Sequence, residues 1–326
     1  MKGLIIAALS LALLLVSPEV FGQVEEEEGN AKLPLPIHDC RYSPRDLPTK
    51  TPRGDLARSF EHLGFPRDDV FRPLLAAPTE PRFSGTFGWA SYEPELSRGN
   101  GLSNFISIFV GLAGSAGLWT FRDRRFCDGV QLNIFGGAFS QFALNPLHLL
   151  NIDYQGGLAV TGSRGDFSAR LRVYHQSSHL GDDFLIANPD FSTQTMSFEA
   201  LDFVAAMVGS WWRIYAGGGW YVRVDPGELG RGSLRLGMEL RSEVWERPAP
   251  FSNMHWAPLF GTDLLSHQAR QWGLTSNTMM GAELVSQKNL RRFRVVATFL
   301  HGYTPYGYFF QDHRVTSPGL EVHFVY

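Results

Sequence analysis

From Arg82 onward the sequence alternates between apolar and polar residues in repeated stretches of about ten residues, and this period of two constrains the fold most. The clearest stretch is LLNIDYQGGLAVTG, in which the apolar parity holds Leu150, Ile152, Tyr154, Leu158 and Val160. Because successive side chains of a strand point to opposite faces, one face would meet apolar surroundings and the other water. The 34 glycines, the 13% of aromatic residues and the low charged fraction of 19% suit many strands joined by turns. An all-β fold is therefore expected.

Twelve antiparallel strands are expected, near 82–92, 104–113, 130–142, 149–161, 166–177, 197–209, 212–224, 232–246, 258–267, 271–286, 292–303 and 317–326. The second has the least certain end, because ISIFVGLAGSAGLWTF continues the pattern past Gly114. An even strand number is typical of bacterial transmembrane barrels, which join strands by short periplasmic turns and longer extracellular loops. The turns GSRGD, VGSWW and SQKNLRR are short, whereas the connections at 178–196 and 304–316 are long. The sequence thus predicts an all-β transmembrane antiparallel β-barrel over 82–326, in the outer membrane of a Gram-negative cell. The alternative, a soluble β-sandwich, would explain the alternation but not the contrast between short turns and long loops.

The last residues, GLEVHFVY, place Leu320, Val322, Phe324 and Tyr326 on one face and end on an aromatic side chain. This resembles the C-terminal strand that outer-membrane barrels present to the barrel assembly machinery. That machinery and outer-membrane lipids are therefore the expected partners. Net charge is −3, and no basic patch alternates with aromatic residues, so nucleic acid is not an expected partner. The oligomeric state is left open.

The N-terminal residues differ from the rest. Lys2, the apolar run Leu4–Val16 and the small residues Val20 and Gly22 predict a secretory signal peptide over 1–22. Residues 23–81 hold an acidic run and many prolines, which break periodicity, so we expect a periplasmic extension that plugs or braces the barrel. Within it, DLARSFEHLGF is expected to form a helix. Two cysteines, Cys40 and Cys127, form no metal or redox motif, and whether they pair is left open.

The stretch LRVYHQSSHLGDDFL contains the candidate site. His175 and Ser177 share the parity of Phe167, Leu171 and Val173, so they would face outward where the strand reaches the extracellular head groups. There the cost of a polar side chain on the lipid face is smallest. On the returning strand, SFEALDFV, Glu199 shares the parity of the apolar Leu201 and Phe203.

If the hairpin pairs Ser177 with Ser197, His175 lies opposite Glu199, whereas a slip by one residue would separate them. Ser177, His175 and Glu199 are then candidates for nucleophile, base and orienting carboxylate. Backbone N–H groups over 178–181 are the candidate donors to an oxyanion. No cofactor-binding residue is assigned.

The His-x-Ser pair on an outward strand resembles the active site of outer-membrane phospholipase A, a twelve-stranded barrel. It also resembles that of lipid A deacylase, whose third member is a Glu on the next strand. Both resemblances imply an acyl-ester hydrolase of the outer leaflet. The phospholipase uses an Asn as third member and calcium near its oxyanion, and no Asn stands at Glu199.

A broader resemblance covers most of the chain. Segments such as FRPLLAAPTEPRFS, GVQLNIFGGAFSQF, VYHQSSHLGDDF, FGTDLLS and YTPYGYFFQDH resemble a family of bacterial outer-membrane barrels called domain of unknown function 1207. This resemblance implies the fold and the location. It implies no activity.

Two functions stay open: a lipid esterase, and a non-enzymatic barrel that is a narrow channel or a structural envelope protein. In the second, HQSSHLGDD would be a loop network or a cation site made of His179, Asp182 and Asp183. Calcium would suit those carboxylates, yet the spacing matches no known loop motif, so no metal ligand is assigned. Charges on the inward parity, Arg170, Arg172, Asp153 and Glu321, are expected to form internal salt bridges that oppose a wide pore.

Overall fold

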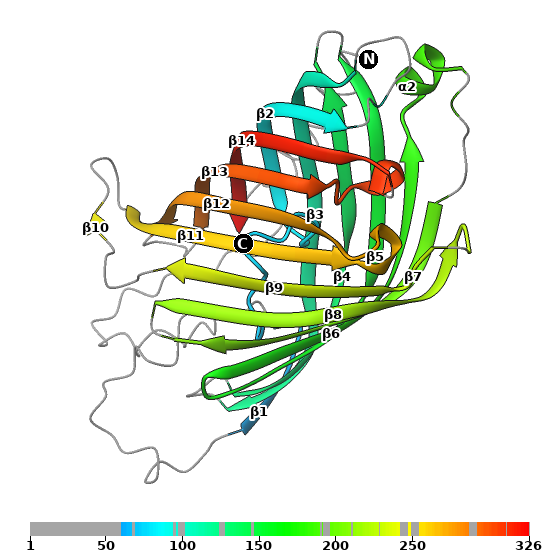
Figure 1. Cartoon of the computed structure of the whole chain (residues 1–326). Helices are drawn as coiled ribbons and strands as arrows, with labels where there is room; N and C mark the ends of the chain where they lie inside the picture. The colour runs from blue at the N-terminus through cyan, green and yellow to red at the C-terminus, as the bar shows by residue number, and fades with distance from the viewer. Residues whose placement is uncertain are drawn as a thin grey trace. The chain divides into compact units, whose positions relative to one another are not determined.

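The structure, a computed structural model, describes residues 60–325 except 67–68, 94–95, 97–101, 124–127, 145–146, 190, 192–195, 210, 228, 242–246, 249–253, 287–291 and 311. Twelve strands follow one another in chain order around a closed antiparallel barrel (Figure 1). Closure comes from β14, which pairs with β2 from Phe324↔Phe83 to Arg314↔Glu93. The predicted fold class and strand number are confirmed. The predicted signal peptide, Cys40, Cys127 and Tyr326 lie outside the described residues.

The barrel strands are β2 (Phe83–Glu93), β3 (Asn104–Asp123), β4 (Gly129–Ala143), β5 (His148–Arg164), β6 (Phe167–Leu180), β7 (Met196–Val208), β8 (Trp212–Asp225), β9 (Gly232–Arg241), β11 (Met254–His267), β12 (Gly273–Ser286), β13 (Arg292–Tyr303) and β14 (Arg314–Val325). Most boundaries fall within a few residues of those predicted. β9 ends at Arg241 rather than at position 246, and β11 begins at Met254 rather than at position 258. A two-residue strand, β10 (Arg247–Pro248), pairs with the added start of β11.

The barrel has two different ends. One, the loop end, carries the connections 181–195 and 304–313, with α2 (Asp182–Ala187), η4 (Gln268–Arg270) and η5 (Gly307–Phe310). The other, the terminal end, is where β2 begins and β14 stops. No helix in the described part of the chain is long and apolar enough to cross a membrane.

The outer surface carries an apolar band between two sets of exposed aromatic side chains. Toward the loop end these are Trp89, Tyr154, Trp220 and Trp272, and toward the terminal end Trp119, Phe167, Trp256 and Phe324. Between them the strands expose residues such as Leu158, Leu171, Val173, Phe203 and Leu236. An apolar band flanked by aromatic girdles is the surface that a transmembrane barrel presents to lipid.

β3 is much longer than the predicted 104–113, because it continues to Asp123. Its glycines and alanines have almost no side chains with which to show a period of two, and the pairing with β4 is irregular between Gly117 and Trp119. β2 pairs with β3 only up to Leu112, so the remainder of that edge would be open. β1 (Phe60–Gly64) covers it by pairing with Trp119–Asp123. The predicted helix in DLARSFEHLGF is therefore wrong for residues 60–64, where capping an exposed strand edge decides the structure.

The lumen is filled by residues 69–82, which we call the lumen segment. Its Phe71, Leu74 and Ala77 pack on Val204, Ala206 and Tyr215 of the wall. On the other side, Leu75 and Ala76 pack on Leu259, Met279 and Val296. Backbone groups are also held, since Leu75 N donates to Glu239 Oε1 (2.8 Å) and Asn277 Nδ2 donates to Ala76 O (2.7 Å). The segment is therefore attached to two parts of the wall, β7–β8 and β11–β13.

Buried ion pairs surround the lumen segment, as the inward parity of the charged residues predicted. Arg170 makes a bidentate pair with Glu80, Arg172 pairs with Asp202 at 3.0 Å, and Arg82 with Glu321 at 3.4 Å. Asp153 differs, because its carboxylate accepts from Gly307 N at 2.7 Å. That bond draws the 304–313 connection into the loop end, where Phe184 of α2 and Phe309 are buried against each other. The lumen is thus packed in its middle and at its loop end.

Candidate functional site

The β6–β7 hairpin has the predicted register. Its pairs include Ser177↔Ser197 and His175↔Glu199. Parity is also as predicted, because Leu171, Val173, Leu201 and Phe203 are exposed on the outer surface. His175, Ser177 and Glu199 therefore point outward with the lipid-facing residues.

One of the two predicted contacts is present. His175 Nδ1 lies 3.2 Å from Glu199 Oε1, with side chains that are 52% and 42% exposed. Since Glu199 is bound at Nδ1, the natural assignment puts the hydrogen on Nδ1 and leaves Nε2 as the basic nitrogen. Ser177 is partly buried on the same face, and no hydrogen bond joins it to His175 in the described structure. The imidazole and the carboxylate are thus in contact, and the hydroxyl of Ser177 lies on the same face two residues further along the strand.

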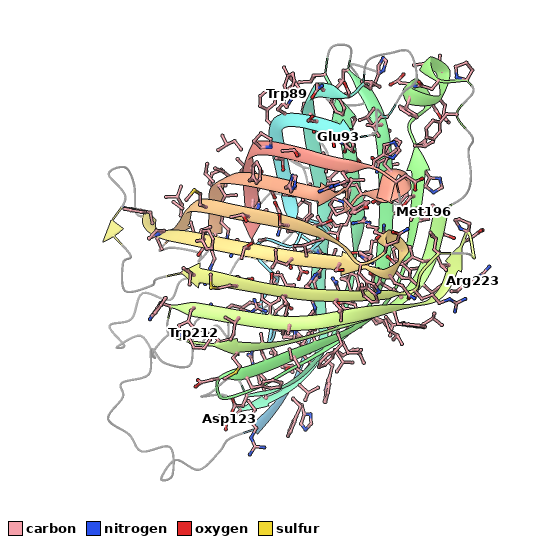
Figure 2. All side chains as sticks on the ribbon, viewed as in Figure 1. Trp89, Glu93, Asp123, Met196, Trp212 and Arg223 are labelled. Carbon is pink, nitrogen blue, oxygen red and sulfur yellow. The ribbon has the colours of Figure 1, made fainter. Side chains whose placement is uncertain are left out.

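The pair lies just beyond the apolar band. The row Leu158, Val173, Leu201 and Trp220 runs around the wall on the terminal-end side of it. The next outward row, toward the loop end, is Gly156, His175, Glu199 and Arg223. Figure 2 shows Arg223 and Met196 at this end of the wall and Trp212 and Asp123 at the other. This level is where lipid head groups begin when an aromatic girdle marks the membrane interface.

Arg223 was missed by sequence reasoning. The register shifts between Glu199 and Ala200 where β7 meets β8, so Val222 and Arg223 are both exposed. A bulge adds one residue to a strand and reverses the parity beyond it. Strict alternation along WYVRVD would place Arg223 on the inward face. It therefore did not predict an arginine opposite Glu199.

The expected oxyanion donors are only partly available. Gly181 N donates to Leu150 O at 2.9 Å, so this amide is engaged and the expectation is wrong for Gly181. A Cβ at Gly181 would meet the backbone of Leu149, which explains why a glycine suits this close approach. A donor would have to come from the remaining amides of 178–180.

No metal site forms here from described residues. Across the described ranges, no group of three or more His, Cys, Asp or Glu side chains is placed to hold an ion. His179 instead contacts the ring of Tyr154, with 5.9 Å between ring centroids. Asp182 and Asp183 begin α2. The cation site proposed for His179, Asp182 and Asp183 therefore has no assembled ligand set.

Comparison with solved structures gives matches to outer-membrane barrels. An active-site mutant of outer-membrane phospholipase A from Escherichia coli is 11% identical, with a TM-score of 0.48 over 80% of this chain and 94% of that chain. The calcium-bound phospholipase dimer from Salmonella typhi is 11% identical, with a TM-score of 0.43 over 78% and 94%. An anion-selective porin from Comamonas acidovorans is 9% identical, with a TM-score of 0.29 over 82% and 100%. At such identities the likeness supports no statement about activity.

Sequence comparisons are more decisive. A search of curated proteins finds no match to the chain. Residues 60–326, which include the whole barrel, match the family described as "Protein of unknown function (DUF1207)". The chain is a member of the DUF1207 family, as its sequence segments predicted.

Proposed function

We propose that this barrel is an acyl-ester hydrolase that acts on outer-leaflet lipid at its outer wall. The observation that carries the proposal is the His175–Glu199 pair, 3.2 Å apart on the outward face at the edge of the apolar band. A base held by a carboxylate, beside a hydroxyl on the same face, is the arrangement that activates a serine nucleophile. A bound imidazole–carboxylate pair has no evident use in holding the hairpin, whose backbone pairing is complete there.

The chemistry follows from the roles of the three side chains. His175 Nε2 takes the proton of Ser177 Oγ as that oxygen attacks the ester carbonyl, and Glu199 stabilises the imidazolium that forms. The tetrahedral intermediate collapses to an acyl-serine, and the protonated imidazole gives its proton to the leaving alcohol. Water then attacks the acyl-serine by the same route in reverse and releases the fatty acid. The His175–Ser177 contact is made by rotation of side chains when substrate binds, since catalytic hydrogen bonds are often long before then.

The position of the site suits a lipid substrate. Ester carbonyls of membrane lipids lie between the acyl chains and the head groups, which is the level of the His175–Glu199 row. A lipid whose chains lie along Leu158, Val173 and Leu201 would present its ester to Ser177. Arg223, exposed beyond Glu199, would bind a phosphate of the head group.

This function sets the orientation. The loop end faces outward from the cell, and the terminal end, with the extension 23–81, faces the periplasm of a Gram-negative cell. Outer-membrane lipid is then the substrate partner, and calcium is a candidate cofactor because it would neutralise a head group or an oxyanion.

A non-enzymatic barrel is the second candidate, favoured by the missing hydrogen bond between His175 and Ser177. In that case the outward polar row would serve only as the boundary of the membrane-embedded surface. A structural envelope protein fits this candidate better than a channel. A channel would require the lumen segment to leave its contacts with both parts of the wall.

The test is fatty-acid release by the purified full chain in mixed micelles, with phospholipid or lipopolysaccharide, with and without calcium. Ser177→Ala removes the proposed nucleophile. Ser197→Ala is the matched control, because Ser197 is the cross-strand partner of Ser177 on the same outward face. We expect release by the wild type and by Ser197→Ala, and a loss of about three orders of magnitude or more in Ser177→Ala. Folding of each variant is checked by circular dichroism and heat-modified electrophoretic mobility.

The outcomes separate the candidates. Equal release by wild type and Ser177→Ala would place any activity elsewhere and reject the Ser177 site. No release from either lipid in any condition would favour the non-enzymatic barrel. The lipid that is hydrolysed distinguishes a phospholipase from a lipid A deacylase.

A further inference from the structure

A cavity of about 220 Å³ lies inside the terminal end of the barrel, on the far side of the lumen segment from the loop end. Its wall is built from both sides of the barrel and from the lumen segment itself. Six arginines line it: Arg72, Arg82, Arg213, Arg241, Arg292 and Arg294. Apolar side chains, among them Trp211, Trp212 and Leu240, line the rest. The cavity is therefore both cationic and apolar.

Four carboxylates of the described residues lie at this cavity or pair with its arginines. Asp69 and Glu239 line it, Glu283 pairs with three of the arginines, and Glu321 pairs with Arg82. Guanidinium groups keep their charge at all relevant pH values. Walls of low dielectric strengthen the attraction of these groups for an anion.

Arg213 shows where an anion would bind. Its side chain is 6% exposed, and Nη1 donates to Pro73 O and Glu239 Oε2, both at 3.4 Å. Phe71 covers its face at 4.5 Å. Nε and Nη2 meet no acceptor within the described part of the chain. These two nitrogens form the side-on edge of the guanidinium, which binds two oxygens of a carboxylate or phosphate at once. A buried arginine with that edge unmatched is costly unless a ligand or water supplies the acceptors.

We propose that this cavity binds a small amphiphilic anion, a carboxylate or phosphate monoester on an apolar body. The anionic oxygens bind the side-on edge of Arg213 after a small side-chain adjustment, and the apolar body packs on Trp211 and Trp212. The lumen segment and the packed loop end close the barrel beyond the cavity, so the ligand binds and is not conducted. This site is separate from the Ser177 site, and neither proposal depends on the other.

Isothermal titration calorimetry of the full chain in non-ionic micelles tests the proposal. The ligands are phenyl phosphate and benzoate, with inorganic phosphate and uncharged benzyl alcohol for comparison. Arg213→Lys keeps the charge and loses the planar edge. Arg164→Lys is the matched control, because Arg164 is an exposed arginine at the terminal end that does not line the cavity. Trp211→Ala removes an exposed turn side chain on which the apolar body would pack.

We expect phenyl phosphate or benzoate to bind the wild type and Arg164→Lys equally, and Arg213→Lys about tenfold or more weakly. Trp211→Ala should weaken phenyl phosphate but leave inorganic phosphate unchanged. Phenyl phosphate against benzoate distinguishes a phosphate ligand from a carboxylate ligand. Absence of binding by both anions overturns the proposal, as does unchanged affinity in Arg213→Lys or equal binding of benzyl alcohol. Trp211→Ala keeps the test valid if Arg213→Lys proves unfolded.

Discussion

Carboxylates of the lumen and of the outer wall are held in different ways. Glu283, inside, is fully buried and has three arginines within 3.6 Å. Glu199, outside, has one partner, His175, and remains 42% exposed. A buried carboxylate needs several partners to offset lost hydration, whereas an exposed pair contributes little to stability. Loss of one partner should therefore destabilise the fold much more in the lumen than on the outer wall.

The same contrast applies to Glu80, which joins the lumen segment to the wall. Burial disfavours its ionisation, but Arg170, together with Arg172 and Arg235, outweighs burial and holds the pKa of Glu80 well below its usual value. Glu80 also accepts a hydrogen bond from within the lumen segment, since Leu74 N donates to Glu80 Oε1 at 3.1 Å. Glu80 thus fixes the backbone of the lumen segment and neutralises two wall arginines.

The largest expected effect follows from removing this charge. Glu80→Gln should lower the free energy of unfolding by about 3–5 kcal/mol, because Arg170 would remain buried without its carboxylate. Urea unfolding in micelles, followed by tryptophan fluorescence, measures the change. Glu199→Gln is the matched substitution on the outer wall and should unfold at nearly the wild-type urea concentration. Equal losses in the two variants would remove the distinction between the two regions.

Acid should separate the two regions next. A carboxylate whose pKa is lowered by folding stabilises the folded state above its ordinary pKa of 4.5, and that contribution is lost as pH falls below this value. Wild-type stability should therefore decline from about pH 4.5 downward, and Glu80→Gln should decline less steeply. Urea midpoints measured between neutral pH and pH 3 test this. Parallel curves for the two proteins would mean that Glu80 is not the group responsible.

Much of the barrel could be predicted because its surface repeats one simple pattern. Period-two alternation predicts strand number and parity, and parity together with hairpin pairing predicts the His175–Glu199 contact. The failures have local causes. The glycines and alanines in the second half of β3 show no period-two pattern, so its end was predicted too early. β1 pairs with the open edge of β3 where a helix was expected.

The sequence predicted the kind of contact made within the lumen, salt bridges, but not which residues pair. The inward arginines predicted that salt bridges would form. The partner of Arg170, however, is Glu80, which is 90 residues away in a proline-rich segment without periodicity. The cationic cavity likewise joins arginines from the ends of β8, β9 and β13 with two from the lumen segment. Parity assigns a residue to the lumen, whereas pairing inside it depends on how the lumen segment is folded.

The smallest expected change in stability is at the outer wall. Glu199→Gln should alter the free energy of unfolding by less than about 0.5 kcal/mol, because an exposed pair contributes little. If the proposed hydrolase is correct, the same variant should lose about two orders of magnitude or more of fatty-acid release, because a neutral amide neither fixes the tautomer of His175 nor stabilises its cation. Unfolding and release are measured on one preparation, with Ser197→Ala as the control. A variant that keeps both stability and activity would leave the outer pair without a function, and only a loss of activity at constant stability supports chemistry at the wall.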